Sequence, residues 1–146
     1  MTQRDNQSQS QTRSQKELLA DKLNDLAATL SSGSPSSDQL TEELNGSALA
    51  AALFARAPIE FLTRRTTADL HLITSTAEST LRQVASGKLP LQVAALTVSG
   101  SVGLVTALGD RPFIINSITE CLRHAGVTIA VLLHPILVAG ERMISL

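Results

Sequence analysis

The chain has one cysteine, Cys121, and only three aromatic residues, all phenylalanine, among its 146 residues. A single cysteine excludes an internal disulfide and a cysteine-rich metal site. We interpret Cys121 as a small buried apolar residue of a helix rather than as a reactive thiol. Without tryptophan or tyrosine, the core must be built from Leu, Ile, Val and Ala, and few rings are present on which nucleic-acid bases could stack.

Net charge is also nearly absent, because the formal charge of the chain is −1 at pH 7. This balance gives no overall attraction to nucleic acid or to an anionic membrane, so we expect neither as a partner. The longest apolar stretch, residues 129–139, is too short to cross a bilayer and is interrupted by His134 and Pro135. The polar amino-terminal residues show no secretory signal, and we expect a cytoplasmic location.

The residue patterns of common catalytic sites are missing as well. His71, His124 and His134 do not have the spacing of metal ligands, and no nucleophile elbow, phosphate-binding loop or dinucleotide-binding glycine motif is present. We therefore expect that the chain binds no cofactor or metal and has no catalytic activity by itself.

Three segments differ in composition. Residues 1–15 are polar and of low complexity, and we predict that they form a disordered tail. Residues 16–87 form a predicted helical segment, whose longest helix spans residues 67–86 and ends at Gly87. Residues 88–146 are rich in strand-forming residues. The order of helices followed by strands indicates the α+β fold class.

The last segment contains the strand signals. Strands are predicted at residues 91–98 and 102–108, joined by a tight turn, and a helix follows from Ile114 to about Ala125. A long apolar strand is then predicted over residues 127–138. A strand, a helix and a second strand in this order form a right-handed crossover unit.

The turn from Gly109 to Phe113, between strand and helix, is the candidate site. Asp110 is suited to cap the first N–H groups of the helix, and Phe113 to pack the helix onto the sheet. The same N–H groups could instead bind a small anion or the carboxylate of an amino acid, with Arg111 as its ion-pair partner. The sequence leaves both interpretations open.

Asn116 and His134 complete the candidate ligand contacts. Asn116 lies four residues after Pro112 and shares a helix face with the turn, where it faces either solvent or a ligand. His134 precedes Pro135 within an apolar run, which indicates a sheet edge or a bulge because proline lacks a ladder donor. The histidine is then either a hydrogen-bonded structural residue or a contact that senses protons or ligand.

Two runs of the sequence, residues 106–118 and 125–137, resemble the amino-terminal region of the large bacterial NAD-specific glutamate dehydrogenases. Residues 53–62 are similar to the helical lead-in of that family. The resemblance implies a first ACT domain, which is a ferredoxin-like β-α-β-β-α-β module of a type that binds amino acids or mediates oligomer contacts.

The resemblance has two consequences for the candidate site and for the fold. Gly109, Arg111 and Asn116 stand where the family has Asp, Met and Asp, so the turn is less acidic than that of the family. Because a complete module needs a second helix and a fourth strand, expected after Leu146, residues 88–146 are predicted to form a partial ACT-type antiparallel sheet with one packed helix.

Two functions follow as expectations. The first is a non-catalytic regulatory or assembly module that associates with itself or with the remainder of a larger dehydrogenase chain, since an exposed apolar strand favours a partner. The second is a stand-alone sensor that binds a small amino-acid ligand through Asp110, Arg111 and Asn116.

Overall fold

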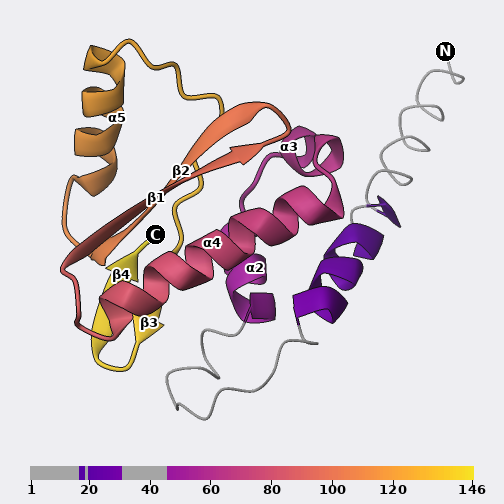
Figure 1. Cartoon of the computed structure of the whole chain (residues 1–146), viewed down its shortest axis with the longest axis horizontal. Helices are drawn as coiled ribbons and strands as arrows, with labels where there is room; N and C mark the ends of the chain where they lie inside the picture. Colours follow the sequence, from indigo (N-terminus) through magenta and orange to yellow (C-terminus); the bar gives the residue numbers. More distant parts are fainter. Residues whose placement is uncertain (1–16, 19, 31–45) are drawn as a thin grey trace, which may run out of the picture.

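The computed structural model describes residues 17–18, 20–30 and 46–146 (Figure 1), so the predicted disordered tail, residues 1–15, lies outside the described residues. Residues 20–30 are helical, and the elements that follow are α2 (Gly46–Phe54), α3 (Ile59–Arg64), α4 (Thr67–Ala85), β1 (Leu91–Val98), β2 (Ser101–Gly109), α5 (Ile114–His124), β3 (Ile136–Ala139) and β4 (Arg142–Ser145). The chain is α+β, as the sequence predicts.

The longest of these helices, α4, begins at a capping box. The Thr66 hydroxyl accepts a hydrogen bond from the Asp69 N–H at 3.1 Å, and the Asp69 carboxylate accepts one from the Thr66 N–H at 2.9 Å. These two bonds satisfy N–H groups that the helix itself cannot pair. Gly87, with φ +73°, follows the helix as predicted, in the left-handed conformation that glycine adopts without strain.

The four strands form an antiparallel sheet in the order β1-β2-β4-β3. β1 and β2 pair along their length and are joined by Ser99 and Gly100, which both have positive φ, as a tight hairpin turn requires. β4 joins β2 through only two residue pairs, Leu108 with Ser145 and Gly109 with Ile144. The junction between the two halves of the sheet is therefore short.

Both β2 and β3 run antiparallel to β4, which lies between them, so α5 connects two parallel strands that are not neighbours. This is the split β-α-β arrangement of ferredoxin-like folds. The predicted strand over residues 127–138 was too long, because residues 127–135 have no regular secondary structure. Pro135 has no N–H for a ladder, and its carbonyl accepts the Leu146 N–H at 3.1 Å, so regular pairing starts only after it.

The core lies between α4 and one face of the sheet. α4 packs across β1 and β2 and also contacts α2 and β4. The same core cluster extends to α2 and to the helix at residues 20–30, and its large, fully buried side chains are Leu26, Leu49, Leu70, Leu81 and Ile144. One helix is thus packed on the sheet, but it is α4 and not α5, which has no buried residue.

Two sequence expectations are corrected by this arrangement. Cys121 is exposed on α5 rather than buried, because α5 does not pack into the core. The sheet also has its four strands within residues 91–145, because β4 and α4, which both precede Leu146, supply the strand and helix that were expected after it.

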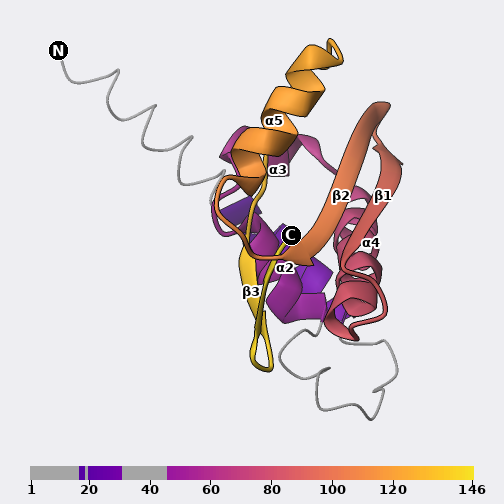
Figure 2. The same ribbon diagram turned by 90° about the vertical axis from the view of Figure 1, so that its left-hand side faces the viewer.

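The opposite face of the sheet carries apolar side chains that remain exposed, and we call it the open sheet face. Register and strand alternation place seven large exposed residues on it: Leu91, Val93, Val102, Leu104, Ile136, Val138 and Met143. Their exposed fractions range from 47% to 80%. In both Figure 1 and Figure 2 the β1–β2 hairpin lies between α4 and α5, so the two helices are on different sides of the hairpin.

Candidate functional site

The turn between β2 and α5 holds three of the four predicted site residues. Asp110 continues the pairing of β2 with β4, because its N–H donates to the Met143 carbonyl at 2.8 Å. Its carboxylate accepts a hydrogen bond from the hydroxyl of Ser145, a residue only 1% exposed, at 2.5 Å. Asp110 is therefore not the cap of α5, as the sequence suggested, but a tie between β2 and β4.

The amino-terminal end of α5 has no side-chain cap. The residue in the cap position is Phe113, whose φ of +65° is left-handed and whose side chain makes no capping hydrogen bond. The Phe113 ring is 76% exposed, so the predicted packing of this ring onto the sheet was wrong. As a result, the first N–H groups of α5 are left without a side-chain acceptor from the cap residue.

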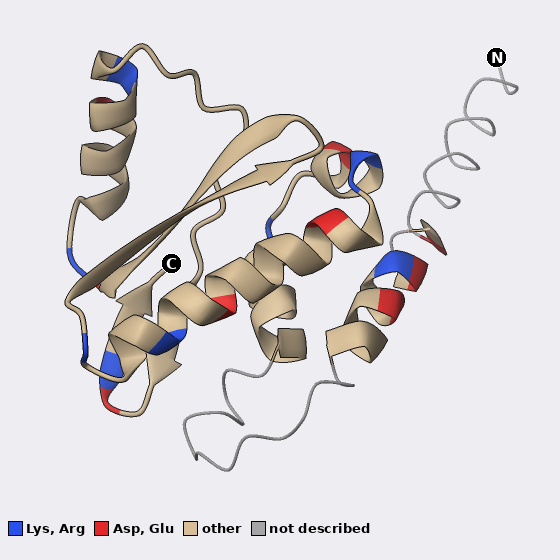
Figure 3. Ribbon diagram, viewed as in Figure 1, with Lys and Arg blue, Asp and Glu red and all other residues tan. Residues whose placement is uncertain are grey.

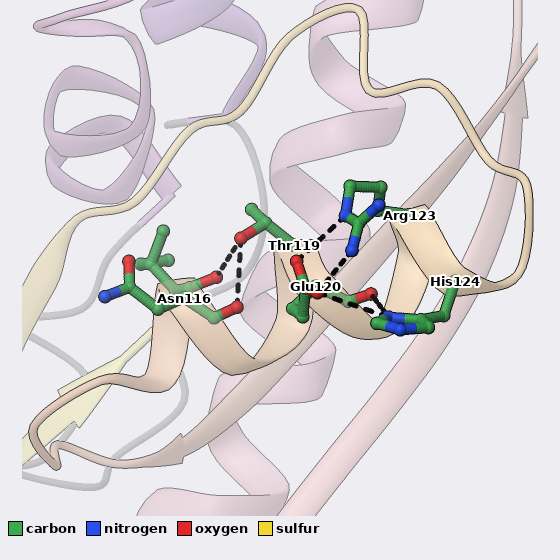
Figure 4. Close-up of polar contacts among 6 residues, drawn as sticks. Asn116, Thr119, Glu120, Arg123 and His124 are labelled. Atoms are coloured by element: carbon green, nitrogen blue, oxygen red, sulfur yellow. Dashed lines mark hydrogen bonds and ion pairs between the residues drawn. The ribbon is translucent and has the colours of Figure 1, made fainter.

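Arg111 and Asn116 are both exposed and lie on either side of this helix end. Asn116 is the third residue of α5, and its carbonyl accepts a 3.1 Å hydrogen bond from the hydroxyl of Thr119, which also donates to the Ile115 carbonyl at 2.8 Å (Figure 4). The chain thus places Asp110, Arg111 and Asn116 within one turn and one helix end, where a cation and free N–H groups could meet an anion.

His134 lies elsewhere. It is exposed and sits in the irregular segment before β3. Asp110 is level with Met143 and Val138 in the sheet, because its N–H bonds to Met143 and Met143 pairs with Val138. His134 comes four residues before Val138, so it lies roughly 13 Å from Asp110 along the strand direction. Because β4 lies between the two chain segments, they are also about 10 Å apart across the sheet. The structure does not bring His134 together with the turn.

The carboxy-terminal half of α5 carries a polar group that the sequence analysis did not single out (Figure 4). The Arg123 guanidinium donates to both Glu120 carboxylate oxygens, at 3.0 and 2.5 Å. This bond lowers the pKa of Glu120 and raises that of Arg123. The His124 imidazole lies 2.9 Å from the Glu120 carbonyl oxygen. In the sequence, this group is indicated by the i,i+3 spacing of Glu120 and Arg123 and the i,i+4 spacing of Glu120 and His124. Because the side chains of Glu120 and Arg123 are exposed, their ion pair contributes little to stability.

Charge is distributed unevenly over the structure. Figure 3 shows Lys, Arg, Asp and Glu on the helices and turns, whereas β1 and β2 carry none. One charged cluster lies at the tip of the hairpin, where the Asp69 carboxylate accepts from the Ser99 hydroxyl at 2.6 Å and Arg65 donates to the Val98 carbonyl at 2.9 Å. The Ser99 hydrogen bond is the main cause of a lowered pKa of Asp69.

Two features are absent from the part of the chain that the structure describes. No group of His, Cys, Asp and Glu side chains there is arranged to hold a metal ion. No helix there combines the length and the hydropathy that a membrane span needs.

The fold and this site define an α+β domain with a ferredoxin-type sheet. The family model described as "Glutamate dehydrogenase, ACT1 domain" matches residues 49–142, which is more than half of the chain. The chain belongs to this family. The match begins in α2 and ends in β4, so it includes α4, the whole hairpin and the turn that holds Asp110. No curated protein and no solved structure matches the chain.

Proposed function

We propose that this chain is a non-catalytic regulatory and assembly module of an NAD-specific glutamate dehydrogenase, and that it acts in the cytoplasm by associating with a second copy or with the remainder of a larger dehydrogenase chain. The membership in the ACT1 family supports the link to glutamate dehydrogenase. The proposal includes no bound cofactor, no nucleic acid and no membrane as partners.

The observation that carries the proposal is the open sheet face. Two strands of about 27 Å and two of about 14 Å, spaced about 5 Å apart, cover roughly 400 Å². This area lies within the roughly 300–600 Å² of the largest apolar patch on a typical monomer, and that patch is often functional. Because six of the seven exposed residues of the face, all except Met143, lie within the family-matched residues 49–142, the proposal assigns the face to assembly and not to chemistry.

Sedimentation velocity of the isolated chain, from low micromolar to millimolar concentration, tests the self-assembly part of the proposal. We expect a weight-average mass that rises with concentration. A compact monomer across the whole range that also fails to bind the catalytic part of a glutamate dehydrogenase contradicts the proposal. An assay of NAD-linked glutamate oxidation with the isolated chain is the companion test, and a measurable rate contradicts the non-catalytic role.

A second candidate function is a stand-alone sensor of amino acids. The observation that favours it is the end of α5, where backbone N–H groups lack a side-chain cap and Arg111 is exposed nearby. A carboxylate bound there would stabilise the folded state. A thermal-shift screen with the common amino acids at millimolar concentration, with Arg111→Ala as the control variant, tests it. The absence of any shift removes this function.

A further inference from the structure

Residues 114–146 are held to the rest of the structure by the β3–β4 pair. Within the described residues, every hydrogen bond that joins this part to the preceding chain ends in β4. Its buried apolar residues are Ala139, Ile144 and Leu146, which lie in or next to the two strands. α5 has no buried residue, and Figures 1 and 2 show it at the outside of the structure, away from α4. This part of the chain thus consists of an arm, residues 114–135, that carries a docking unit, residues 136–146.

The docking unit makes few contacts, but they are specific. β4 pairs with β2 at Leu108–Ser145 and Gly109–Ile144, and it also contacts α4. Ile144 is only 1% exposed, and the Ser145 hydroxyl donates to the Asp110 carboxylate. The docking unit of a second copy can make the same contacts in the same place, so an exchange between two copies needs no new complementarity.

The hinge between β2 and the arm is short and strained. Asp110 still belongs to the sheet through its hydrogen bond to the Met143 carbonyl, and α5 begins at Ile114, so residues 111–113 alone make the turn. Phe113 has a φ of +65°, a left-handed conformation that is disfavoured by at least about fivefold for a residue with a bulky side chain. Short hinges under strain favour exchange between copies, because an extended hinge releases the strain.

We propose that two copies of this chain exchange residues 114–146, so that β4 of each copy pairs with β2 of the other. The inference goes beyond the proposed function, because the exchange leaves the open sheet face exposed. Each half of the dimer keeps the contacts of the single chain, and only residues 111–113 change, from a turn to an extended link. The second copy then supplies Ser145, the hydrogen-bond partner of Asp110 in the candidate site. The exchange is mutual, so the dimer is closed.

The length of the arm and the strain of the hinge set the concentration at which exchange competes with folding of the single chain. Within one chain, the arm holds the docking unit near its site at an effective concentration in the millimolar range or below. Release of two strained Phe113 residues favours the dimer by about 25-fold more, so we expect dimers from roughly 50 micromolar upward. Because Ile144 must leave the core, the exchange is slow and is reached by refolding. It is therefore distinct from rapid association through the open sheet face.

Disulfide mapping in the full chain tests the exchange. With Cys121→Ser as the background, Leu108→Cys with Ser145→Cys places two thiols at paired residues of β2 and β4, whose Cα atoms are about 5.5 Å apart and can be bridged. The disulfide closes within one chain in the monomer and joins two chains in the exchanged dimer, and denaturing electrophoresis without reductant distinguishes the two. After refolding, we expect intrachain bonds at low micromolar concentration and mostly interchain bonds near the millimolar range.

The matched control is Thr97→Cys with Val102→Cys in the same background. These two residues pair within the β1–β2 hairpin, which stays in one chain whether or not the arm is exchanged. Both are exposed, and Val102 is 80% exposed whereas Ser145 is 1% exposed, so random collision between chains would favour the control. We expect the control disulfide to close within one chain at every concentration.

Two substitutions of Phe113 test the hinge. Phe113→Gly adopts a positive φ without strain, so the turn of the single chain is relieved and the dimerisation constant after refolding should fall by about 25-fold. Phe113→Ala keeps the strain and removes only a ring that is 76% exposed, so it should dimerise as the unmodified chain does. Gel filtration of samples refolded at equal concentrations measures the difference, and equal dimerisation of the two variants overturns the role of the hinge.

The outcomes separate this inference from the proposed function. Interchain bonds that increase with concentration for the β2–β4 cysteine pair, but not for the control pair, support the exchange. Equal interchain bonding of both pairs, or no interchain bond near the millimolar range, overturns it. A chain that associates reversibly while the β2–β4 pair closes only within one chain overturns the exchange and leaves the proposed function intact. An exchanged dimer without reversible association supports the exchange and contradicts the self-assembly part of the proposed function.

Discussion

The hydrogen bond between Ser145 and Asp110 should contribute measurably to stability because it reinforces the shortest junction of the sheet. Only two residue pairs join β4 to β2, and the Asp110 N–H adds one further bond to Met143. A hydrogen bond to a charged acceptor contributes about 1.5–3 kcal/mol, and solvent at the exposed Asp110 brings this toward the lower end. Asp110→Ala also leaves the hydroxyl of the buried Ser145 without its acceptor.

We therefore expect Asp110→Ala to lower the free energy of unfolding by about 1–2 kcal/mol and the melting temperature by roughly 3–6 °C. Thermal and urea unfolding of Asp110→Ala, Ser145→Ala and the double variant form a double-mutant cycle, with an expected coupling of about 1 kcal/mol. Arg111→Ala, on the exposed neighbour, should change stability by less than about 0.5 kcal/mol. Additive effects of the two single variants, or an unchanged melting temperature for Asp110→Ala, refute the reasoning.

Three further predictions concern the core, the hairpin and the pH dependence. Leu81→Ala removes a fully buried side chain of α4 and should cost about 2–5 kcal/mol in urea unfolding, whereas the same change at Leu72, which is 42% exposed, should cost far less. Gly100→Ala meets no atom within 4 Å but forces φ +75° on an L residue, so thermal unfolding should show a loss of about 1 kcal/mol; no loss would argue against the turn geometry. The lowered pKa of Asp69 means that its contribution to stability is present above the ordinary aspartate pKa and is lost as pH falls through the folded-state pKa. Urea midpoints measured from neutral to acidic pH should therefore fall less steeply for Asp69→Asn than for the unmodified chain, and identical slopes would contradict this.

The elements that the sequence predicted well are those governed by local signals. The hairpin at residues 91–98 and 102–108 and the end of α4 at Gly87 follow from strand-forming runs, positive-φ positions and helical periodicity. The strand over residues 127–138 failed because an apolar run alone does not provide a ladder partner. Pro135 delays pairing, and only three residues of that run, Ile136, Leu137 and Val138, pair with β4.

The candidate site was predicted less well, because its geometry depends on contacts between residues far apart in the sequence. Asp110 has a side chain suited to cap a helix, but its carboxylate instead accepts a hydrogen bond from the hydroxyl of Ser145, which lies 35 residues later in the sequence. α4 packs on the sheet and α5 has no buried residue, although the sequence predicted both as helices, and no local pattern reports which of the two packs. The ligand role of Arg111, Asn116 and His134 stays a prediction.

A charge placed on the open sheet face tests the central claim most directly. Val102→Lys introduces a charge at its most exposed apolar residue, which is 80% exposed, and Leu72→Lys, at a residue of α4 that is 42% exposed, is the matched control. We predict that Val102→Lys abolishes the rise of weight-average mass with concentration and the binding to the catalytic part of a glutamate dehydrogenase, whereas Leu72→Lys retains the association of the unmodified chain. If Val102→Lys associates as the unmodified chain does, the open sheet face is not the surface through which the chain assembles.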